Sequence, residues 1–514
     1  MPFFKLERNV FYRWVEIAGA SVLVVIGSLI MLLASRWPFT QNAVITALQE
    51  RFSSMVEFKT FRGTYLPPGC VIEGITFHLN NDRNAPALAT VEKLTIRGGY
   101  IGLFTSPKRI GQVKVEGLHV LIPSSSERKD EMQRTSRTSQ SALIIGEIIA
   151  DGAVVRFARD KGPTEPLQFD IHRLRLDSVA DDRPMSFHAT LRNPEPPGEV
   201  RADGQLGPLR PSDFNHIALS GSYGFQQANL GTFPGIAGTL SSDGKFYGVV
   251  EHIDVEGATD VPDFQVTRSG HSVHLNTQFH AVVNGADGNV SLQSVNAQFE
   301  NTLVASQGEV AGKPSETGKT VSIGATQTKG RIEDWLRLFA KSNRPTLTGS
   351  MNFRTRVAFP FEQGRFLDQI TLQGDFGIDT MRFTHYEIQQ DVNSLSERAQ
   401  GEKEDGDPES VVSNLKGHVE VKNGIATFST LSFSLPGALA QLHGTYGLVN
   451  EQINLHGTLQ LDARLSKGSK GVRSFLLKVV EPFLKKRDAG EVVPIKLTGS
   501  YERPSYGVDY LGSI

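Results

Sequence analysis

Apolar and polar residues alternate along much of the chain. The segment 89–96 reads Ala-Thr-Val-Glu-Lys-Leu-Thr-Ile, and a similar alternation fills 113–120. Successive side chains of a strand point to opposite faces, so a period of two predicts strands with one buried face. The segment 71–79 is predicted to be extended as well. From about residue 142 onward such segments follow one another with few interruptions, which predicts a mostly β body.

A short phrase of leucine, any residue and glycine recurs in this body. It begins at Leu219, Leu347, Leu372, Leu415, Leu442, Leu455 and Leu497. The irregular spacing excludes a strict solenoid repeat. A glycine inside a strand marks a bulge or a bend, so the repetition favours a long sheet that curls. The alternative is that these glycines end the strands of ordinary sandwiches, and the pattern alone leaves it open.

A long apolar run lies near the N-terminus. Residues 17–34 carry no charge, and at about 1.5 Å per residue the run approaches the length that crosses a hydrocarbon core of about 30 Å. Trp14 and Trp37 flank the run, as aromatic residues do at membrane interfaces. We therefore predict a transmembrane helix over 15–36. The anchor residues are Ile17, Leu23, Val25, Leu29 and Leu32.

A cleaved signal peptide is the competing interpretation of this run. Signal peptides have shorter apolar regions and small residues at the cleavage site, whereas this run ends in Leu32-Leu33-Ala34. Basic residues also precede the run more often than they follow it, since Lys5, Arg8 and Arg13 lie before it and Arg36 after it. The positive-inside rule then places residues 1–14 in the cytoplasm and exports the body.

Three segments have the period of short amphipathic helices, namely 41–52, 331–341 and 474–487. In the second, Ile332, Trp335, Leu336 and Phe339 form one stripe. In the third, the apolar face comprises Leu476, Val479, Val480, Phe483 and Leu484. We favour this third helix as a cap on the end of the sheet. Its nearby basic residues leave open a contact with an anionic membrane surface.

The composition is balanced in charge, with 53 Lys and Arg against 55 Asp and Glu. A protein that binds nucleic acid usually carries a basic excess to neutralise phosphates, so we expect no nucleic-acid partner. The single cysteine, Cys70, excludes an intramolecular disulfide. It follows Pro67, Pro68 and Gly69, so we expect a small buried hydrophobe at the edge of a turn.

The sequence contains no catalytic motif of the common kinds. It lacks Gly-x-Ser-x-Gly, His-Glu-x-x-His and a phosphate-binding glycine loop. The 13 histidines are scattered, and His443 and His456 lie on predicted strands, which favours surface histidines over a metal site. We predict no catalytic residue, no metal ligand and no enzyme activity. A sheet with few helices must instead cover its apolar face with a second sheet, by closure into a barrel, or with a mobile apolar ligand.

Phrases near both ends of the chain resemble the AsmA-like family of bacterial envelope proteins. At the N-terminal end they are the membrane anchor, Pro38-Phe39-Thr40, the strand 88–94, Gly102-Leu103-Phe104 and the segment 110–117. At the C-terminal end they are the segments 334–338, 345–349, 395–401, 421–426, 435–438 and 493–499, before Pro504. The centre of the chain resembles the family only in style.

The resemblance implies a protein anchored in the bacterial inner membrane by one span, with its body in the periplasm. The family is similar to bridge-like lipid-transfer proteins, whose folded sheet forms a groove for phospholipid tails. It implies transfer of phospholipid between envelope membranes, in support of outer-membrane lipid homeostasis, with phospholipid as cargo and no cofactor. Membrane lipids and an outer-membrane or periplasmic protein are the implied partners. The alternative is a non-catalytic scaffold or assembly factor for outer-membrane biogenesis.

The expected fold is mostly β. A transmembrane helix precedes an elongated, curled antiparallel sheet that forms a hydrophobic groove, with a few short amphipathic helices. The expected order is a cytoplasmic tail (1–14), the membrane helix (15–36), an N-terminal β region (37–122), a polar loop (123–141), a central β region (142–345) and a C-terminal β region (346–514). The sequence does not identify the residues that line the groove.

Overall fold

A computed structural model describes most of the body of the chain. The described residues are 40–42, 55–78, 87–99, 102, 108–122, 143–157, 167–180, 183–194, 196–208, 216–233, 235–267, 269–285, 289–312, 319–340, 344–360, 369–384, 386, 389–390, 392–393, 396, 413–461, 492–500 and 503–509. The predicted membrane helix, the loop 123–141 and the helix 474–487 lie outside them, as does most of 41–52. Within this part of the chain no helix has the length and hydropathy needed to cross a membrane.

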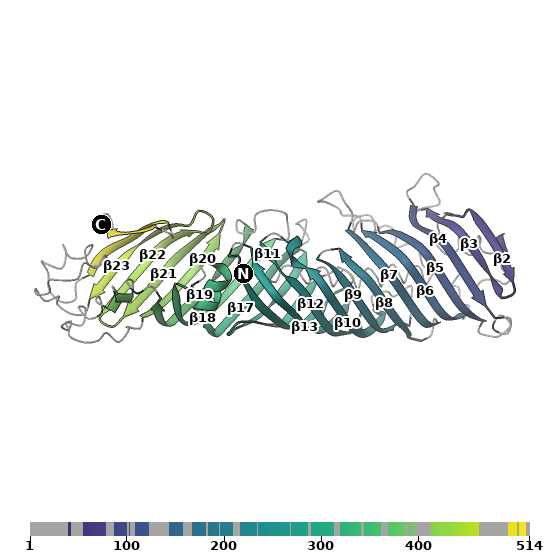
Figure 1. Ribbon diagram of the computed structural model, residues 1–514, viewed down its shortest axis with the longest axis horizontal. Coiled ribbons are helices and arrows are strands. Elements are labelled where there is room, and N and C mark those ends of the chain that lie inside the picture. Colours follow the sequence, from purple (N-terminus) through teal and green to yellow (C-terminus); the bar gives the residue numbers. More distant parts are fainter. Residues whose placement is uncertain are drawn as a thin grey trace, which may run out of the picture. The chain divides into compact units, whose positions relative to one another are not determined.

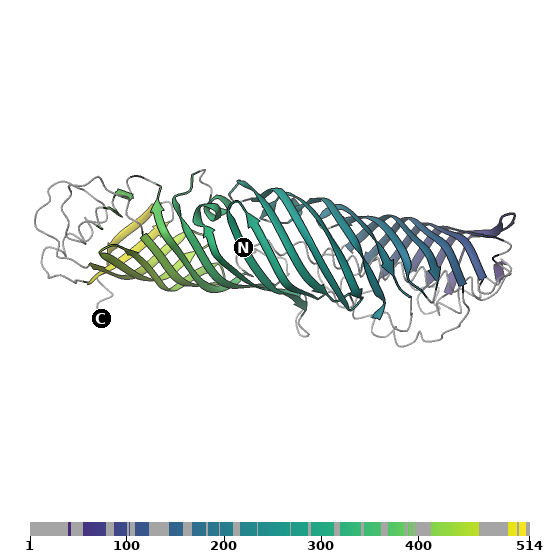
Figure 2. The same cartoon turned by 90° about the horizontal axis from the view of Figure 1, so that it is seen from below.

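Strands account for 80% of the described residues and form one unclosed sheet of 25 strands. The predicted mostly β body with very few helices is therefore confirmed. The chain divides into two compact units. The first contains residues 3–261 and 278–291, and the second contains 262–277 and 292–514. Within each unit the strands run obliquely and the sheet curls (Figures 1 and 2).

The first unit is a run of adjacent strands, each paired with the next in the sequence, apart from the short β1 and β11. These are β1 (Met55–Glu57), β2 (Thr60–Tyr65), β3 (Pro68–His78), β4 (Ala87–Gly98), β5 (Lys108–Ile122), β6 (Leu143–Phe157), β7 (Leu167–Ala180), β8 (Met185–Pro194), β9 (Pro197–Leu206), β10 (Ala218–Asn229), β11 (Ile236–Ala237) and β12 (Thr239–Val249). The 3-10 helix η3 (Leu230–Thr232) follows β10. The division between the units passes through β13 (His252–Val266), β14 (Ser272–Val283) and β15 (Val290–Phe299).

One pair departs from the predicted antiparallel order. Strands β5 and β6 are parallel, with Lys108 opposite Leu143 and Ile122 opposite Phe157. Two parallel neighbours need a connection of a dozen or more residues, because the chain must return to the end of the sheet at which the first strand began. The polar segment 123–141 falls within this connection, so its length is explained by the topology.

The second unit contains further strands of the sheet and helix α5. Its remaining elements are β16 (Thr302–Gly312), β17 (Lys319–Arg331), α5 (Ile332–Phe339), β18 (Leu347–Pro360), β19 (Thr371–Phe383), β20 (Ser413–Lys422), β21 (Ile425–Leu435), β22 (Ala438–Gly447), β23 (Gln452–Leu461), β24 (Val492–Ser500) and β25 (Arg503–Val508). From β16 to β25 each strand pairs antiparallel with the next. Helix α5 confirms the helix predicted over 331–341.

At one level of β3 to β7 each strand carries one extra residue, and the pairing among these strands keeps its register across it. The residues skipped by the pairing are Gly74, Glu92, Gly117, Gly152 and His172. The three glycines have φ of 62–66°, which L side chains rarely adopt. Because every strand gains its extra residue at the same level, the apolar residues return to one face on both sides of the line. Thus Ile72 and Ile75 are both buried, although two residues, Glu73 and Gly74, lie between them.

Candidate functional site

The two faces of the first unit differ sharply in chemistry. One face is a continuous apolar layer, and residues such as Ile72, Ile96, Val113, Ile145 and Leu176 are at most 1% exposed. The other face carries charged and polar side chains in cross-strand rows. A buried apolar layer of this kind is a packed core and leaves little surface for a ligand.

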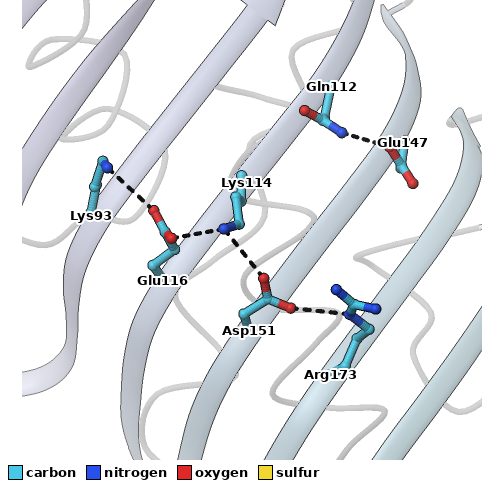
Figure 3. Close-up of polar contacts among 7 residues, drawn as sticks. All are labelled: Lys93, Gln112, Lys114, Glu116, Glu147, Asp151 and Arg173. Atoms are coloured by element: carbon cyan, nitrogen blue, oxygen red, sulfur yellow. Dashed lines mark hydrogen bonds and ion pairs between the residues drawn. The ribbon is translucent and has the colours of Figure 1, made fainter.

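The polar face is held by a ladder of opposite charges (Figure 3). Lys114 Nζ lies 2.7 Å from Glu116 Oε1 and 3.4 Å from Asp151 Oδ2, so one cation joins two acids. The ladder extends at both ends, because Lys93 lies 3.6 Å from Glu116 and Arg173 lies 3.3 Å from Asp151. The hydrogen bond between Lys114 and Glu116 lowers the pKa of the Glu116 carboxyl and raises the pKa of the Lys114 ammonium group. Opposite charges facing each other across strands stabilise one register over its neighbours.

The histidines of the polar face pair with carboxylates. His188 lies 2.6 Å from Asp203, and His418 lies 2.7 Å from Asp375 on the adjacent strand. His456, opposite His443 in the register of β22 and β23, lies 2.6 Å from Asp509. Among the described residues no group of three or more His, Cys, Asp or Glu side chains is placed to hold a metal ion. These histidines thus form polar contacts on the sheet surface.

The apolar face of the second unit differs from that of the first. Between β19 and β24, two neighbouring rows of apolar residues run across the strands, and we call them together the apolar stripe. The first row, in order of strands, is Phe376, Gly417, Leu431, Leu442, Gly457 and Ile495. The second row is Gly374, Val419, Phe428, Gly444, Leu455 and Leu497. Neither row contains a charged or polar side chain.

Most side chains of the apolar stripe are partly exposed. This holds for Phe376, Val419, Phe428, Leu431, Leu442, Ile495 and Leu497. A third row beside the stripe is packed more tightly, since Ala440, Leu459 and Val493 belong to a buried cluster with Val392 and Leu435. The stripe is therefore a partly exposed band of the face, bordered on one side by a core.

Several positions of the stripe are glycines because the neighbouring backbone leaves no room for a side chain. A Cβ at Gly457 would collide with the carbonyl oxygen of Gln441, and a Cβ at Gly444 with that of Asn454. The pairing passes through Gly374 and Gly457 without a register shift. At these positions the predicted bulge is absent, and the glycine is needed because the neighbouring backbone approaches closely. At Gly349 the predicted bulge is present, between Thr348 and Ser350.

Helix α5 closes one end of the apolar stripe. The first row continues from Phe376 to Phe353 on β18 and to Gln327 on β17. Trp335 covers this end, because its ring lies 5.6 Å from that of Phe353 and 5.0 Å from that of Phe299. Its Nε1 donates a hydrogen bond of 2.9 Å to Gln327 Oε1, and Gln327 Nε2 donates one of 2.9 Å to Met351 O.

Buried hydrogen bonds fix the position of α5. Asp334 Oδ2 accepts from Thr302 Oγ1 at 2.8 Å and from Asn301 N at 3.1 Å. Burial raises the pKa of Asp334, while these two hydrogen bonds act in the opposite direction. Thr302 Oγ1 also accepts from Arg331 N at 3.0 Å. The wall at this end of the stripe is thus tied to the hairpin of β15 and β16.

The sequence-predicted sites have mixed outcomes. The anchor residues of 15–36 and the cap residues of 474–487 lie outside the described residues. Cys70 is fully buried as the third residue of β3 after the β2–β3 turn, and burial raises the pKa of its thiol to about 12. This confirms the small buried hydrophobe. The residues of the apolar stripe were not identified from the sequence. The recurring leucine–glycine phrase could have indicated them, because residues two positions apart in a strand lie on the same face.

Comparisons of the chain with known protein families and with curated proteins found no match.

Proposed function

We propose that the protein binds phospholipid acyl chains along the apolar stripe and transfers phospholipids between envelope membranes. The observation that supports this proposal most directly is the band of uncharged, partly exposed side chains on β19 to β24. Uncovered apolar surface of this kind marks a site for an apolar partner. Five strand steps of about 4.8 Å give a length of about 24 Å. One leaflet of a hydrocarbon core is about 15 Å thick, so an acyl chain fits lengthwise.

The resemblance to the AsmA-like family supports the cellular setting of this proposal. A single span over 15–36 would anchor the chain in the inner membrane and place the body in the periplasm. The stripe would then act as the hydrophobic groove expected for the sheet. Membrane lipids would be the main partners, and a periplasmic or outer-membrane protein would complete the path.

The first unit favours a second candidate function. Its apolar face is buried in the manner of a closed core, as expected for a non-catalytic scaffold in outer-membrane biogenesis. The two proposals differ in what the second unit binds. A scaffold does not need the stripe to stay uncovered, whereas lipid transfer does.

The test is native mass spectrometry of the full chain purified in mild detergent. Leu442→Gln places an amide in the stripe, and Leu439→Gln, on the opposite face of the same strand and also partly exposed, is the matched control. We expect co-purified phospholipid with the wild type and with Leu439→Gln, and its loss in Leu442→Gln. Absence of phospholipid from all three proteins would favour the scaffold.

A further inference from the structure

We infer that Trp335 is the end stop against which the methyl end of an acyl chain lies on the apolar stripe. The inference rests on the proposed function and adds a fixed end to the site. Trp335 is 8% exposed and stands over the row that continues into the stripe. Its ring stacks on Phe339 at 6.0 Å and meets Phe299 and Phe353 edge to face. These four rings form an aromatic wall across one end of the stripe.

The wall is rigid because α5 is held along its length. Asp334 binds the β15–β16 turn, and Glu333 Oε2 accepts from Gly349 N at 3.2 Å at the start of β18. Arg337 forms an ion pair of 3.1 Å with Glu300 in the same turn. A side chain fixed by packing and hydrogen bonds holds its place when a ligand presses on it. A ligand chain therefore ends at Trp335, since the helix cannot yield without breaking these contacts.

The chemistry of the wall selects the methyl end of the chain. Gln327, the polar residue beneath Trp335, already has its carbonyl and amide groups bonded to Trp335 and Met351. Gln327 is also only 2% exposed, so its burial keeps a phosphate or glycerol oxygen away from it. A terminal methyl that abuts Phe353 and Trp335 buries more apolar surface than one that lies elsewhere on the open stripe. The polar headgroup then lies toward β22.

The lengths are consistent with this orientation. From Phe353 on β18 to Leu442 on β22 there are four strand steps, or about 19 Å. A chain about 15 Å long that starts one van der Waals contact from Phe353 ends close to Leu442. The open remainder of the stripe, toward Ile495 and Leu497, lies on the headgroup side. The tryptophan therefore fixes the position of the methyl end, and the position of the headgroup follows from the length of the chain.

Fluorescence quenching tests the orientation directly. The full chain with Trp14→Phe and Trp37→Phe keeps Trp335 as its sole tryptophan. The probes are two phosphatidylcholines, one brominated near the methyl end of its chains and one near the carboxyl end. We expect a larger loss of Trp335 emission with the first probe. In the same background Leu442→Gln should lose the quenching by both probes, and Leu439→Gln should keep it.

A second variant tests the end stop. Trp335→Ala removes apolar surface that the methyl end buries and should lower the amount of co-purified phospholipid in the mass spectrum, whereas Trp335→Phe should lower it less. Equal quenching by both probes, or stronger quenching by the carboxyl-end probe, would overturn the inference while lipid binding stands. An unchanged amount of bound phospholipid in a folded Trp335→Ala protein would also overturn it. Absence of bound lipid in every protein would remove the proposed function itself.

Discussion

Glycines decide how the faces of this sheet are shaped. In the first unit, Phe187 and Phe246 lie in one row with Gly204 and Gly221 between them, and their rings stack at 6.4 Å. A Cβ at Gly221 would lie 2.7 Å from the ring of Phe246. The aromatic rings thus occupy the space that the glycines leave. In the apolar stripe the ring of Phe376 lies over Gly417 in the same way, at 3.0 Å from an added Cβ, whereas an added Cβ at Gly444 or Gly457 meets neighbouring backbone.

The role of Gly221 can be measured against a neighbour on the same strand. Gly221→Ala should destabilise the protein by about 1–3 kcal/mol, because the added Cβ meets Phe246 and the Asp203 carbonyl. Gly224→Ala is the control, since nothing lies within 4 Å of its added Cβ. It should be neutral or stabilising by about 0.4–1 kcal/mol. Thermal unfolding of both variants gives the comparison, and equal losses would contradict the packing argument.

Cys70 should be unreactive in the folded protein. Burial raises the pKa of its thiol to about 12, so almost no thiolate is present at pH 8. Iodoacetamide should label Cys70 only after denaturation, as read by intact mass. Lys245→Cys, on the exposed side of β12, provides a positive control that reacts in the native state. Native labelling of Cys70 at the rate of that control would show that the start of β3 opens readily.

At the scale of elements, each strand is specified by its two faces. The apolar alternation predicted β3, β4, β5 and helix α5 from the sequence, because burial follows side-chain periodicity. The parallel pairing of β5 and β6 was not predicted, since strand direction depends on where a long connection returns. The register was also beyond prediction. The charges of Lys114, Glu116 and Asp151 show their complementarity only once the strands are aligned.

The Lys114 bridge should stabilise the first unit over a defined pH range. Its hydrogen bond lowers the pKa of Glu116, so this contribution is present above the ordinary carboxyl pKa of 4.5 and is lost as pH falls through the lowered value. The raised pKa of Lys114 keeps the contribution until pH rises above 10.5 and through the raised value. Lys114→Gln should melt below the wild type at neutral pH.

The difference in melting temperature should shrink in acid and in high salt, because the residues are exposed and screened. A difference that persists unchanged below the lowered pKa of Glu116 would point to packing by the lysine stem instead.

The position of α5 should depend on one hydroxyl. Thr302→Val removes the acceptor for Arg331 N and leaves the buried Asp334 carboxylate without the hydroxyl partner. We expect a loss of about 1–3 kcal/mol in the free energy of unfolding. Thr427→Val, on an exposed position of β21, is the control and should change little. Emission of Trp335 reports the same change locally, and an unaltered spectrum would argue against the clamp.

At the scale of the whole molecule, one sheet carries two kinds of apolar face. The sequence predicted the sheet, its curl and its apolar side, because these follow from alternation and glycine content. It did not reveal that the face of the first unit is buried and that the face of the second is partly exposed. That difference depends on which residues share a row, such as Leu431 with Leu442, and rows are set by the pairing of distant segments.

The central claim is that acyl chains lie on the apolar stripe. It is tested most directly by photo-crosslinking with benzoylphenylalanine at Leu431, Leu442 and Leu439, in cells that incorporate labelled phospholipid. The first two positions face the stripe, and the third faces the opposite side of β22. We predict phospholipid adducts at Leu431 and Leu442 and none at Leu439. Adducts at equal yield from both faces, or at none of the three positions, would contradict the account.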